Sequence, residues 1–434
     1  MGLGFLSSII SGSSLLPSLA ALAGAGLLVI LGIRGISGAL NVVMLCGGFL
    51  VSMNALRAGP EVSAADAMFG IAALLALVLT TRRSNKDYLK SFLPAIFLIA
   101  LVIFGGLSGS FSSTDQVGGL AELGRFAASS MLLLFIVALW APTPKRIQGL
   151  AWAIVLGTTL NAALSFGVEK LAGRAMGLSN HPNHLGLACA LSIGAALGLA
   201  FTTRRSGLRG VLFVCVCLLS AAILASGSRA ALLGSVVSVM VFVVASKPWK
   251  LVAWGLLATA VVLSVAQAGF LYLGEFNAFN RIVGDSSALA SDRARTRLAA
   301  DAIEMIWVNP IIGSGFEQAK VAHSIYLQLW VSAGVLGIVA IGGLGYLVVR
   351  VLLKARREDN FLAIGLASSF LGYLAAGAFS NILWDRYVWL HLAMLLASKT
   401  SFRPPSPAQS DPITIQSTGH KTETSFNRTP IEPS

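Results

Sequence analysis

The sequence predicts an all-α fold, a polytopic integral membrane helical bundle, and three observations support this prediction. Hydrophobic residues make up 56% of the 434 residues and charged residues only 11%, too few to cover the surface of a soluble domain. Apolar stretches long enough to cross a bilayer core of about 30 Å as helices recur along the chain. The polar–apolar alternation of β-strands is absent. Helices therefore have to satisfy the backbone hydrogen bonds in the membrane.

Thirteen apolar segments are candidates for transmembrane helices. They cover 17–33, 38–56, 64–81, 92–110, 124–141, 147–166, 183–201, 209–226, 229–246, 250–272, 324–349, 361–380 and 386–398. Basic loops alternate with loops poor in Lys and Arg, and the positive-inside rule places the basic ones in the cytoplasm. They lie at 81–90, 144–146, 204–209, 247–250 and 350–357. This alternation puts the loop 273–323 outside the cell and the C-terminus inside.

Thirteen spans would leave the N-terminus outside. If one segment within 1–56 is re-entrant or interfacial, about 12 transmembrane helices place both ends inside, and this is the arrangement we expect. The first apolar segment has neither a positive n-region nor a small-residue cleavage site, so we expect it to be retained as a span. Residues 1–398 then form the transmembrane domain, with 273–323 as its large extracytoplasmic loop. Residues 399–434 are rich in Pro, Ser and Thr and are predicted to form a disordered cytoplasmic tail.

The net charge of +13 would suggest a nucleic-acid partner for a soluble protein. In this chain the basic residues mostly occupy short loops between spans, so membrane topology explains most of the charge and no nucleic acid is expected. Cys46, Cys189, Cys215 and Cys217 all lie in apolar spans, where cysteine behaves as a small hydrophobic residue. We expect no disulfide and no zinc-binding cysteine cluster.

Arginines also occur in the outward connections, against the usual placement of positive charge. They are Arg174, Arg229, Arg281, Arg293, Arg295 and Arg297. The spans that start near 183, 229 and 324 enter from the same side, so their positive N-terminal ends point outward as well. Arginines and helix N-termini together predict an anion-binding site on this face.

The motif "RAMGLSNHPNHLG" (174–186) places several polar groups before an apolar span. Helix capping explains Asn180 or His181 as the cap and Pro182 in the first turn. Capping alone does not require the whole set, which consists of Arg174, His181, Asn183 and His184. The two histidines could also bind a metal, but no carboxylate or cysteine is near them in the sequence, so we expect no metal.

In "SGSRAALLG" (226–234), Ser228 can cap the next helix, which puts Arg229 in the first turn, where a cation opposes the helix dipole. Two explanations stay open for Arg229. It is an interfacial arginine whose charged end reaches toward water, or it binds an anion at the helix N-terminus.

The stretch 291–315 predicts an amphipathic helix that starts at Ser291 or Asp292 and ends at Asn309-Pro310, before a glycine turn. Its apolar stripe consists of Leu298, Ala302, Met305 and Ile306. Arg295 lies in line with this stripe, whereas Arg293 and Arg297 project to the opposite, solvated face. Arg295 therefore points at the protein, where a charge needs a partner or a ligand.

His323 comes just before the next span in "AHSIYLQLW" (322–330). A single histidine at a membrane interface usually has no special role. This one follows the long outer loop, and its neutral imidazole can accept a proton near pH 7. We favour a functional role for His323.

These motifs resemble those of the O-antigen ligase and O-antigen polymerase family of bacterial envelope glycan enzymes. The matching pieces are "RAMGLSNHPNHLG", "SGSRAALLG" and "RTRLAADAIEMIWVNPIIGSGF", followed by "AHSIYLQLWVSAGVLG", over roughly 174–340. The resemblance implies a GT-C-type lipid-dependent glycosyltransferase of the inner membrane, metal-independent and without a cofactor. It further implies an extracytoplasmic active site, an undecaprenyl-diphosphate-linked glycan as donor and a glycan or lipid-linked acceptor.

By motif position, the resemblance places the diphosphate-binding role on Arg229, Arg295 and Arg174 and the catalytic role on His323. His181, Asn183 and His184 are candidates for contacts with the glycan donor or the acceptor. Ser324 follows His323 where family members often have Asn, so the acceptor contact differs at this position.

Several functions remain open from the sequence. A polymerase and a ligase share these motifs, and the sequence does not separate them. A flippase or transporter of an anionic lipid-linked substrate would keep ionisable groups deep within several spans, whereas these spans are nearly free of them. A structural scaffold gives no reason for Arg295 to point inward.

Overall fold

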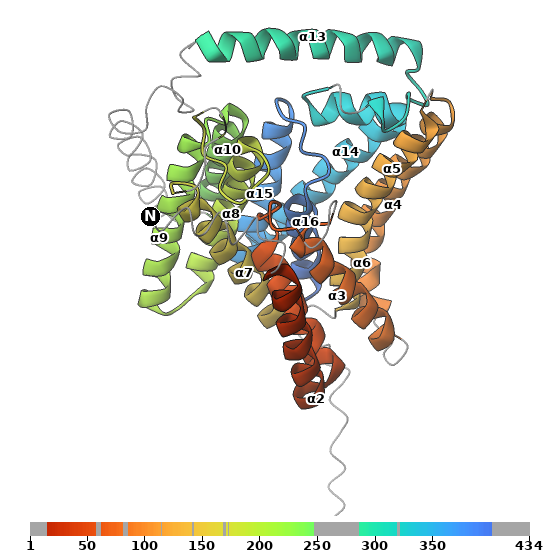
Figure 1. The fold of residues 1–434 in the computed structure, drawn as a ribbon. Helices are drawn as coiled ribbons and strands as arrows, with labels where there is room; N and C mark the ends of the chain where they lie inside the picture. The colour runs from red at the N-terminus through yellow and green to blue at the C-terminus, as the bar shows by residue number, and fades with distance from the viewer. Residues whose placement is uncertain are drawn as a thin grey trace, which may run out of the picture. The chain divides into compact units, whose positions relative to one another are not determined.

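The computed structural model describes residues 15–57, 62–80, 86–113, 115–140, 143–167, 171, 173–246, 286–318 and 322–401. Over these residues the chain is helical, with no β-sheet (Figure 1). The helices are α2 (Leu15–Leu50), α3 (Ala64–Thr80), α4 (Lys86–Phe111), α5 (Gln116–Ala127), η1 (Ala128–Leu132), α6 (Leu133–Leu139), α7 (Pro144–Leu164), α8 (Pro182–Thr202), α9 (Ser206–Ala225), α10 (Arg229–Ser246), α13 (Ser286–Val308), α14 (Ile325–Arg357), α15 (Phe361–Gly377) and α16 (Arg386–Ser401).

Length and composition make seven of the described helical segments long and apolar enough to cross a membrane. They are Leu89–Phe111, Gln116–Leu139, Pro144–Leu164, Pro182–Thr202, Ser206–Ala225, Arg229–Ser246 and Ile325–Arg357. The polytopic helical fold is thus confirmed. The total of about 12 spans stays a prediction, because the candidate span 250–272 lies outside the described residues.

The two earliest predicted spans, 17–33 and 38–56, form the single element α2 with a break at Gly35, where φ is 66°. Beyond the break, the apolar helix Gly35–Leu50 is shorter than a full span. The predicted tail 399–434 starts within α16, and 402–434 lie outside the described residues, so this boundary stays a prediction.

Helix α8 is the most buried of the candidate spans, with 78% of its most apolar window inside the protein. Small residues let it approach α15 closely. A Cβ added at Gly194 of α8 would lie 2.8 Å from the carbonyl oxygen of Gly365 in α15, and a Cβ at Gly365 would lie 2.3 Å from that of Gly194. Such contacts between small residues are typical of helices packed in membranes. They fix α8 at the centre of the bundle.

Helix α13 lies across one end of the helix bundle, which we call the α13 end (Figure 1). Ala302 and Ile306 are buried on α14, where they pack with Val331. The predicted apolar stripe therefore contacts the protein. The predicted start at Ser291 or Asp292 is wrong, because the helix begins at Ser286. The Asp292 carboxylate binds a distant arginine instead of capping the helix.

Candidate functional site

The N-termini of α8, α10, α14 and α16 lie near the α13 end, as the contacts below show. His181 caps α8, since its Nδ1 accepts a hydrogen bond from the backbone N–H of Asn183 at 3.1 Å. Ser228 caps α10 in the predicted manner, with its Oγ 3.3 Å from the backbone nitrogen of Ala231. Helix N-termini carry unpaired N–H groups and a partial positive charge, and they favour bound anions.

Arg174 joins the start of α8 to the end of α9. Its Nε donates to the carbonyl oxygen of Ser226 at 2.7 Å, and its Nη2 donates to Oδ1 of Asn183 at 2.7 Å. Asn183 is buried. The structure therefore brings two of the predicted site residues into direct contact, and it adds a positioning role for Arg174.

Asn161 of α7 forms hydrogen bonds that hold the loop before α8, and the sequence analysis missed this residue. The fully buried Asn161 accepts a hydrogen bond from the backbone N–H of Leu178 at 2.7 Å. Its Nδ2 donates to the carbonyl oxygen of Ser52 at 2.8 Å. Gly177 in the same loop has a φ of 56°, and a Cβ there would lie 2.4 Å from Oδ1 of Asn161. Only glycine fits this close approach without strain.

His184 pairs with Asp385, the second residue that the sequence analysis missed. Its Nδ1 lies 2.9 Å from Oδ1 of Asp385, and the other carboxylate oxygen accepts a hydrogen bond from the Tyr387 hydroxyl at 2.7 Å. Asp385 is buried, and it directly precedes α16. A carboxylate bound to one imidazole nitrogen fixes the orientation of the ring. The sequence offered one signal for this residue, because Asp385 is an acid at the start of the apolar helix α16. Nothing in the sequence indicated that its partner is His184.

His181 and His323 lie within electrostatic range of the predicted arginines. Burial lowers the pKa of His181 from 6.5 to about 4, and neighbouring His and Arg groups contribute to this shift. In decreasing order of effect, these groups are His184, Arg174, His323 and Arg295. Five predicted site residues from distant parts of the chain therefore come together at one place.

His323 is half-buried and lies within electrostatic range of Arg295. Burial, and then the positive charge of Arg295, lowers the pKa of His323, so its imidazole is neutral at pH 7. Its Nδ1 is buried and has no hydrogen-bond partner among the described residues. A neutral imidazole with an uncommitted ring nitrogen can accept a proton from a hydroxyl group.

Arg229 forms an ion pair with Asp292 of α13, and its Nη1 lies 2.9 Å from Oδ2 of Asp292. The pair connects the first residue of α10 to α13. Arg229 lies in the first turn of α10, where its charge opposes the helix dipole, and the Asp292 carboxylate supplies a compensating negative charge. Both side chains are partly exposed, so an incoming anion can reach the guanidinium group.

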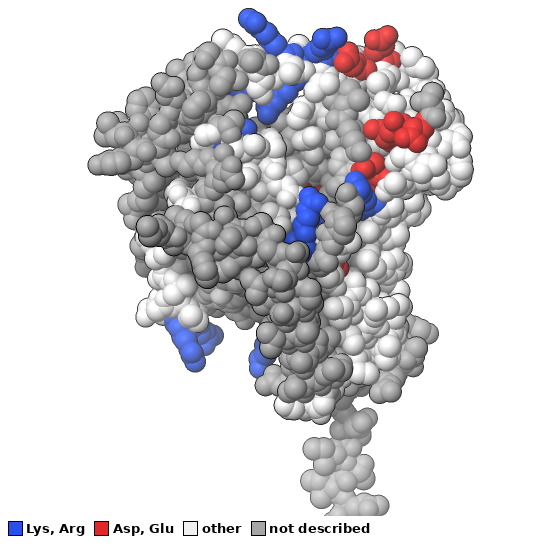
Figure 2. All heavy atoms as spheres, in the orientation of Figure 1, with Lys and Arg blue, Asp and Glu red and all other residues white. Residues whose placement is uncertain are grey.

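The three arginines of α13 differ as predicted. Arg293 and Arg297 are exposed, whereas Arg295 is half-buried on the side of the histidines. Figure 2 shows basic and acidic side chains together at the α13 end. In the part of the chain that the structure describes, no three His, Cys, Asp or Glu side chains are grouped so that they could hold a metal ion.

Residues 213–342 match the family model described as O-Antigen ligase. The match begins within α9, includes α10 and α13 and ends within α14, so it contains Arg229, Arg295 and His323. A comparison with curated protein sequences gives no significant match. The match to the family model supports an O-antigen ligase or polymerase family for the chain and membrane glycosyl transfer of that type.

Proposed function

We propose that the protein transfers a glycan from an undecaprenyl-diphosphate carrier to an acceptor hydroxyl group, at the extracytoplasmic end of the bundle and without a metal ion. The observation that carries this proposal is the convergence of arginines, neutral histidines and helix N-termini at the α13 end. Glycosyl transfer from a lipid diphosphate needs both kinds of group. Positive charge stabilises the diphosphate as it leaves, and a neutral base takes the proton of the acceptor hydroxyl group.

The distribution of charge supports the extracytoplasmic side. The connection between α8 and α9 contains Arg204 and Arg205, both exposed, and the positive-inside rule assigns this end to the cytoplasm. Helix α8 runs from the α13 end to this connection. The α13 end therefore faces away from the cytoplasm, in the inner membrane of a bacterial cell.

Arg229 and Arg295 bind the diphosphate in this proposal. Guanidinium groups contact phosphate oxygens in a bidentate manner and stabilise the charge that develops on the leaving group. The N-termini of α8 and α10 add partial positive charge. Arg174 contributes positive charge from its fixed position between Asn183 and Ser226. The diphosphate has to compete with Asp292 for Arg229, so binding of the glycan donor loosens the contact between α10 and α13.

His323 acts as the general base. It takes the proton of the acceptor hydroxyl group, whose oxygen attacks the anomeric carbon of the donor glycan. The bond between that carbon and the diphosphate oxygen breaks, and undecaprenyl diphosphate leaves with the electron pair. We expect inversion at the anomeric carbon. His181, Asn183 and His184 border the site and contact the donor glycan or the acceptor, and Asp385 positions the His184 ring.

The experiment uses purified protein in nanodiscs with the host's lipid-linked glycan, and resolves the products by mass. Wild type is compared with Arg295→Ala, His323→Ala and the matched control Arg293→Ala on the exposed face of the same helix. Longer lipid-linked chains would establish a polymerase, and transfer to an added non-polyprenyl acceptor would establish a ligase. Both products should disappear in Arg295→Ala and His323→Ala and persist in Arg293→Ala.

One result would contradict the catalytic proposal. If several acceptors give no product while the lipid-linked glycan still binds in an Arg295-dependent way, the protein is a flippase or transporter of this substrate.

A further inference from the structure

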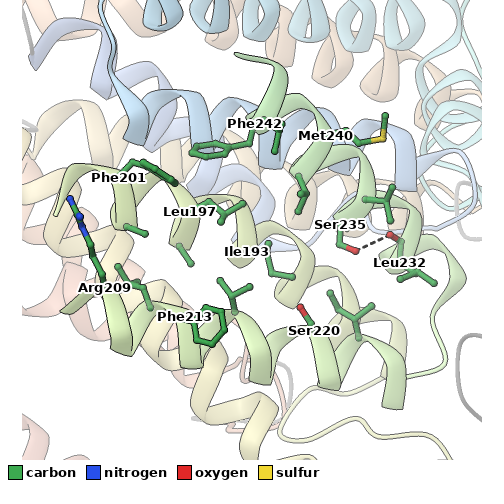
Figure 3. Close-up of a pocket in the computed structure, with 18 of the residues that line it drawn as sticks. Ile193, Leu197, Phe201, Arg209, Phe213, Ser220, Leu232, Ser235, Met240 and Phe242 are labelled. Atoms are coloured by element: carbon green, nitrogen blue, oxygen red, sulfur yellow. Dashed lines mark hydrogen bonds between the residues drawn. The ribbon is translucent and has the colours of Figure 1, made fainter. Parts of the chain in front are cut away.

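An apolar groove runs between α9 and α10, with α8 as its floor (Figure 3). Its volume is about 830 Å³. Helices α9 and α10 both pack along α8 but make few contacts with each other. The short side chains of Ala196 and Ala200, one helical turn apart on α8, give the groove its depth. It is a site separate from the polar cluster at the α13 end.

The groove has the lining and the length that suit a hydrocarbon chain. Phe213 and Val216 of α9 line it, as do Val239 and Met240 of α10, and Met240 is 61% exposed. Along α9 the lining extends from Arg209 to Ile223, a distance of about 20 Å at 1.5 Å per residue. This covers most of the hydrocarbon core, which is about 30 Å thick.

Among the described residues that line the groove, charge is present at only one end. Arg209 is the one ionisable residue among those that line it, and Figure 3 shows it at the end away from Ser220, Ser235 and Leu232. Its Nε donates to the carbonyl oxygen of Thr203 at 2.7 Å. Its two Nη atoms form no hydrogen bond with the described residues. The Nε atom fixes the guanidinium group, and the two Nη atoms are able to donate hydrogen bonds to the oxygens of a phosphate group.

The surroundings of Arg209 are positive. Arg204 and Arg205 precede α9 and are exposed, and the sequence contains no Asp or Glu from 170 to 274. At the end of α14, Glu358 is 3.4 Å from Lys354 and is balanced by it. In Figure 2, the visible basic side chains below α9 have no acidic side chain beside them. This end therefore complements an anionic headgroup at the cytoplasmic surface.

We propose that the groove between α9 and α10 binds an anionic phospholipid of the cytoplasmic leaflet, with an acyl chain in the groove and the phosphate on Arg209. The polyprenyl tail of the glycan donor is the competing occupant. The position of the charge argues against it. Arg229 is not among the lining residues, and the described residues at the other end of the groove present only serine hydroxyls and aliphatic side chains.

Delipidated full-length protein in detergent provides the test. It is titrated with phosphatidylglycerol and with phosphatidylcholine of the same acyl chains, and bound lipid is counted by native mass spectrometry. We expect wild type to prefer phosphatidylglycerol. Arg209→Gln should weaken phosphatidylglycerol binding about fivefold, the effect of one basic residue near a membrane surface, and leave phosphatidylcholine unchanged. Arg350→Gln removes an exposed arginine of α14 and should behave as wild type.

A second pair of variants tests the groove itself. A Cβ at Gly210 meets no atom within 4 Å, and Gly210 lines the groove, so Gly210→Leu adds a side chain to the groove without a clash at its Cβ. It should weaken binding of both lipids several-fold. Gly207, on the same helix, is equally open but does not line the groove, so Gly207→Leu should bind as wild type.

The proposal is overturned if wild type binds the two phospholipids equally, or if Arg209→Gln or Gly210→Leu leaves binding unchanged. Undecaprenyl phosphate is titrated in parallel. If its binding depends on Gly210 but not on Arg209, the groove holds the polyprenyl tail instead. Because binding is the readout, failure here is distinguishable from failure of the glycosyl transfer.

Discussion

Two arginines at the α13 end, Arg174 and Arg229, are held by other parts of the fold, whereas Arg204 and Arg205 at the opposite end are exposed. Arg174 bonds to Asn183 and a carbonyl oxygen, and Arg229 pairs with Asp292. Arg204 and Arg205 lie in a short connection with no acid nearby in the sequence. Holding a charge at a defined position costs side-chain entropy and desolvation free energy. This difference supports the proposal that membrane sidedness explains Arg204 and Arg205, and that chemistry at a site explains Arg174 and Arg229.

The strongest way to test this comparison is to remove the proposed general base, His323. His323→Gln should reduce the rate of glycan transfer by about 10² to 10⁴-fold, the usual contribution of general acid–base catalysis. Binding of the lipid-linked glycan should persist. Arg204→Gln at the opposite end should change the rate by no more than about twofold, as expected for an exposed substitution. Transfer rates and donor binding are measured on the same nanodisc preparations for both variants. Similar transfer rates in His323→Gln and Arg204→Gln would refute the distinction between the two ends of the bundle.

A second test removes the side chain of Asn161, which holds the loop before α8 at the α13 end. Asn161→Ala leaves the backbone N–H of Leu178 without its acceptor inside the protein. We expect a loss of about 2 to 3 kcal/mol of stability, seen as a lower Tm in detergent. Asn180→Ala, at an exposed position in the same loop, serves as the control. An unchanged Tm for Asn161→Ala would show that the loop does not depend on this amide.

The electrostatic environment of His323 gives a third test. Because burial and Arg295 lower its pKa, the imidazole should titrate below pH 6.5, and the protonated form that dominates at lower pH cannot act as a base. Arg295→Gln should raise this pKa toward 6.5 without reaching it, since burial remains. NMR titration of ¹³C-labelled histidines measures the change. Arg293→Gln should leave the titration midpoint of His323 unchanged. An equal shift in both variants would argue against a specific electrostatic effect of Arg295 on His323.

The smallest expected effect concerns the ion pair between α10 and α13. Asp292→Asn removes the carboxylate that pairs with Arg229 and that, in the proposed function, competes with the diphosphate. Affinity for the lipid-linked glycan should rise, by less than about fivefold, because partly exposed pairs contribute about 1 kcal/mol or less. A binding titration in nanodiscs checks the direction. Weaker binding in Asp292→Asn would mean that the pair organises the site instead of competing with the ligand.

Local patterns in the sequence predicted the helices well. The candidate span 229–246 coincides with α10 (Arg229–Ser246), because a serine cap, an apolar run and a basic loop all lie within a few residues of its ends. The orientation of Arg295, opposite to Arg293 and Arg297, followed from the 3.6-residue period of an α-helix. The start of α13 was predicted wrongly because a local cap signal at Ser291-Asp292 was satisfied by a distant partner.

The sequence by itself therefore determined the membrane-spanning helical fold and the motif residues, and it indicated the resemblance to a family. Tertiary structure alone decided which of these residues meet. His184 and Asp385 are 201 positions apart, Asn161 and Ser52 are 109 apart, and Arg229 and Asp292 are 63 apart. Periodicity, caps and loop charge act over one or two helical turns, so they fix each helix and its direction. Pairings over such distances depend on how whole helices pack, and in this protein small residues on α8 and α15 set that packing.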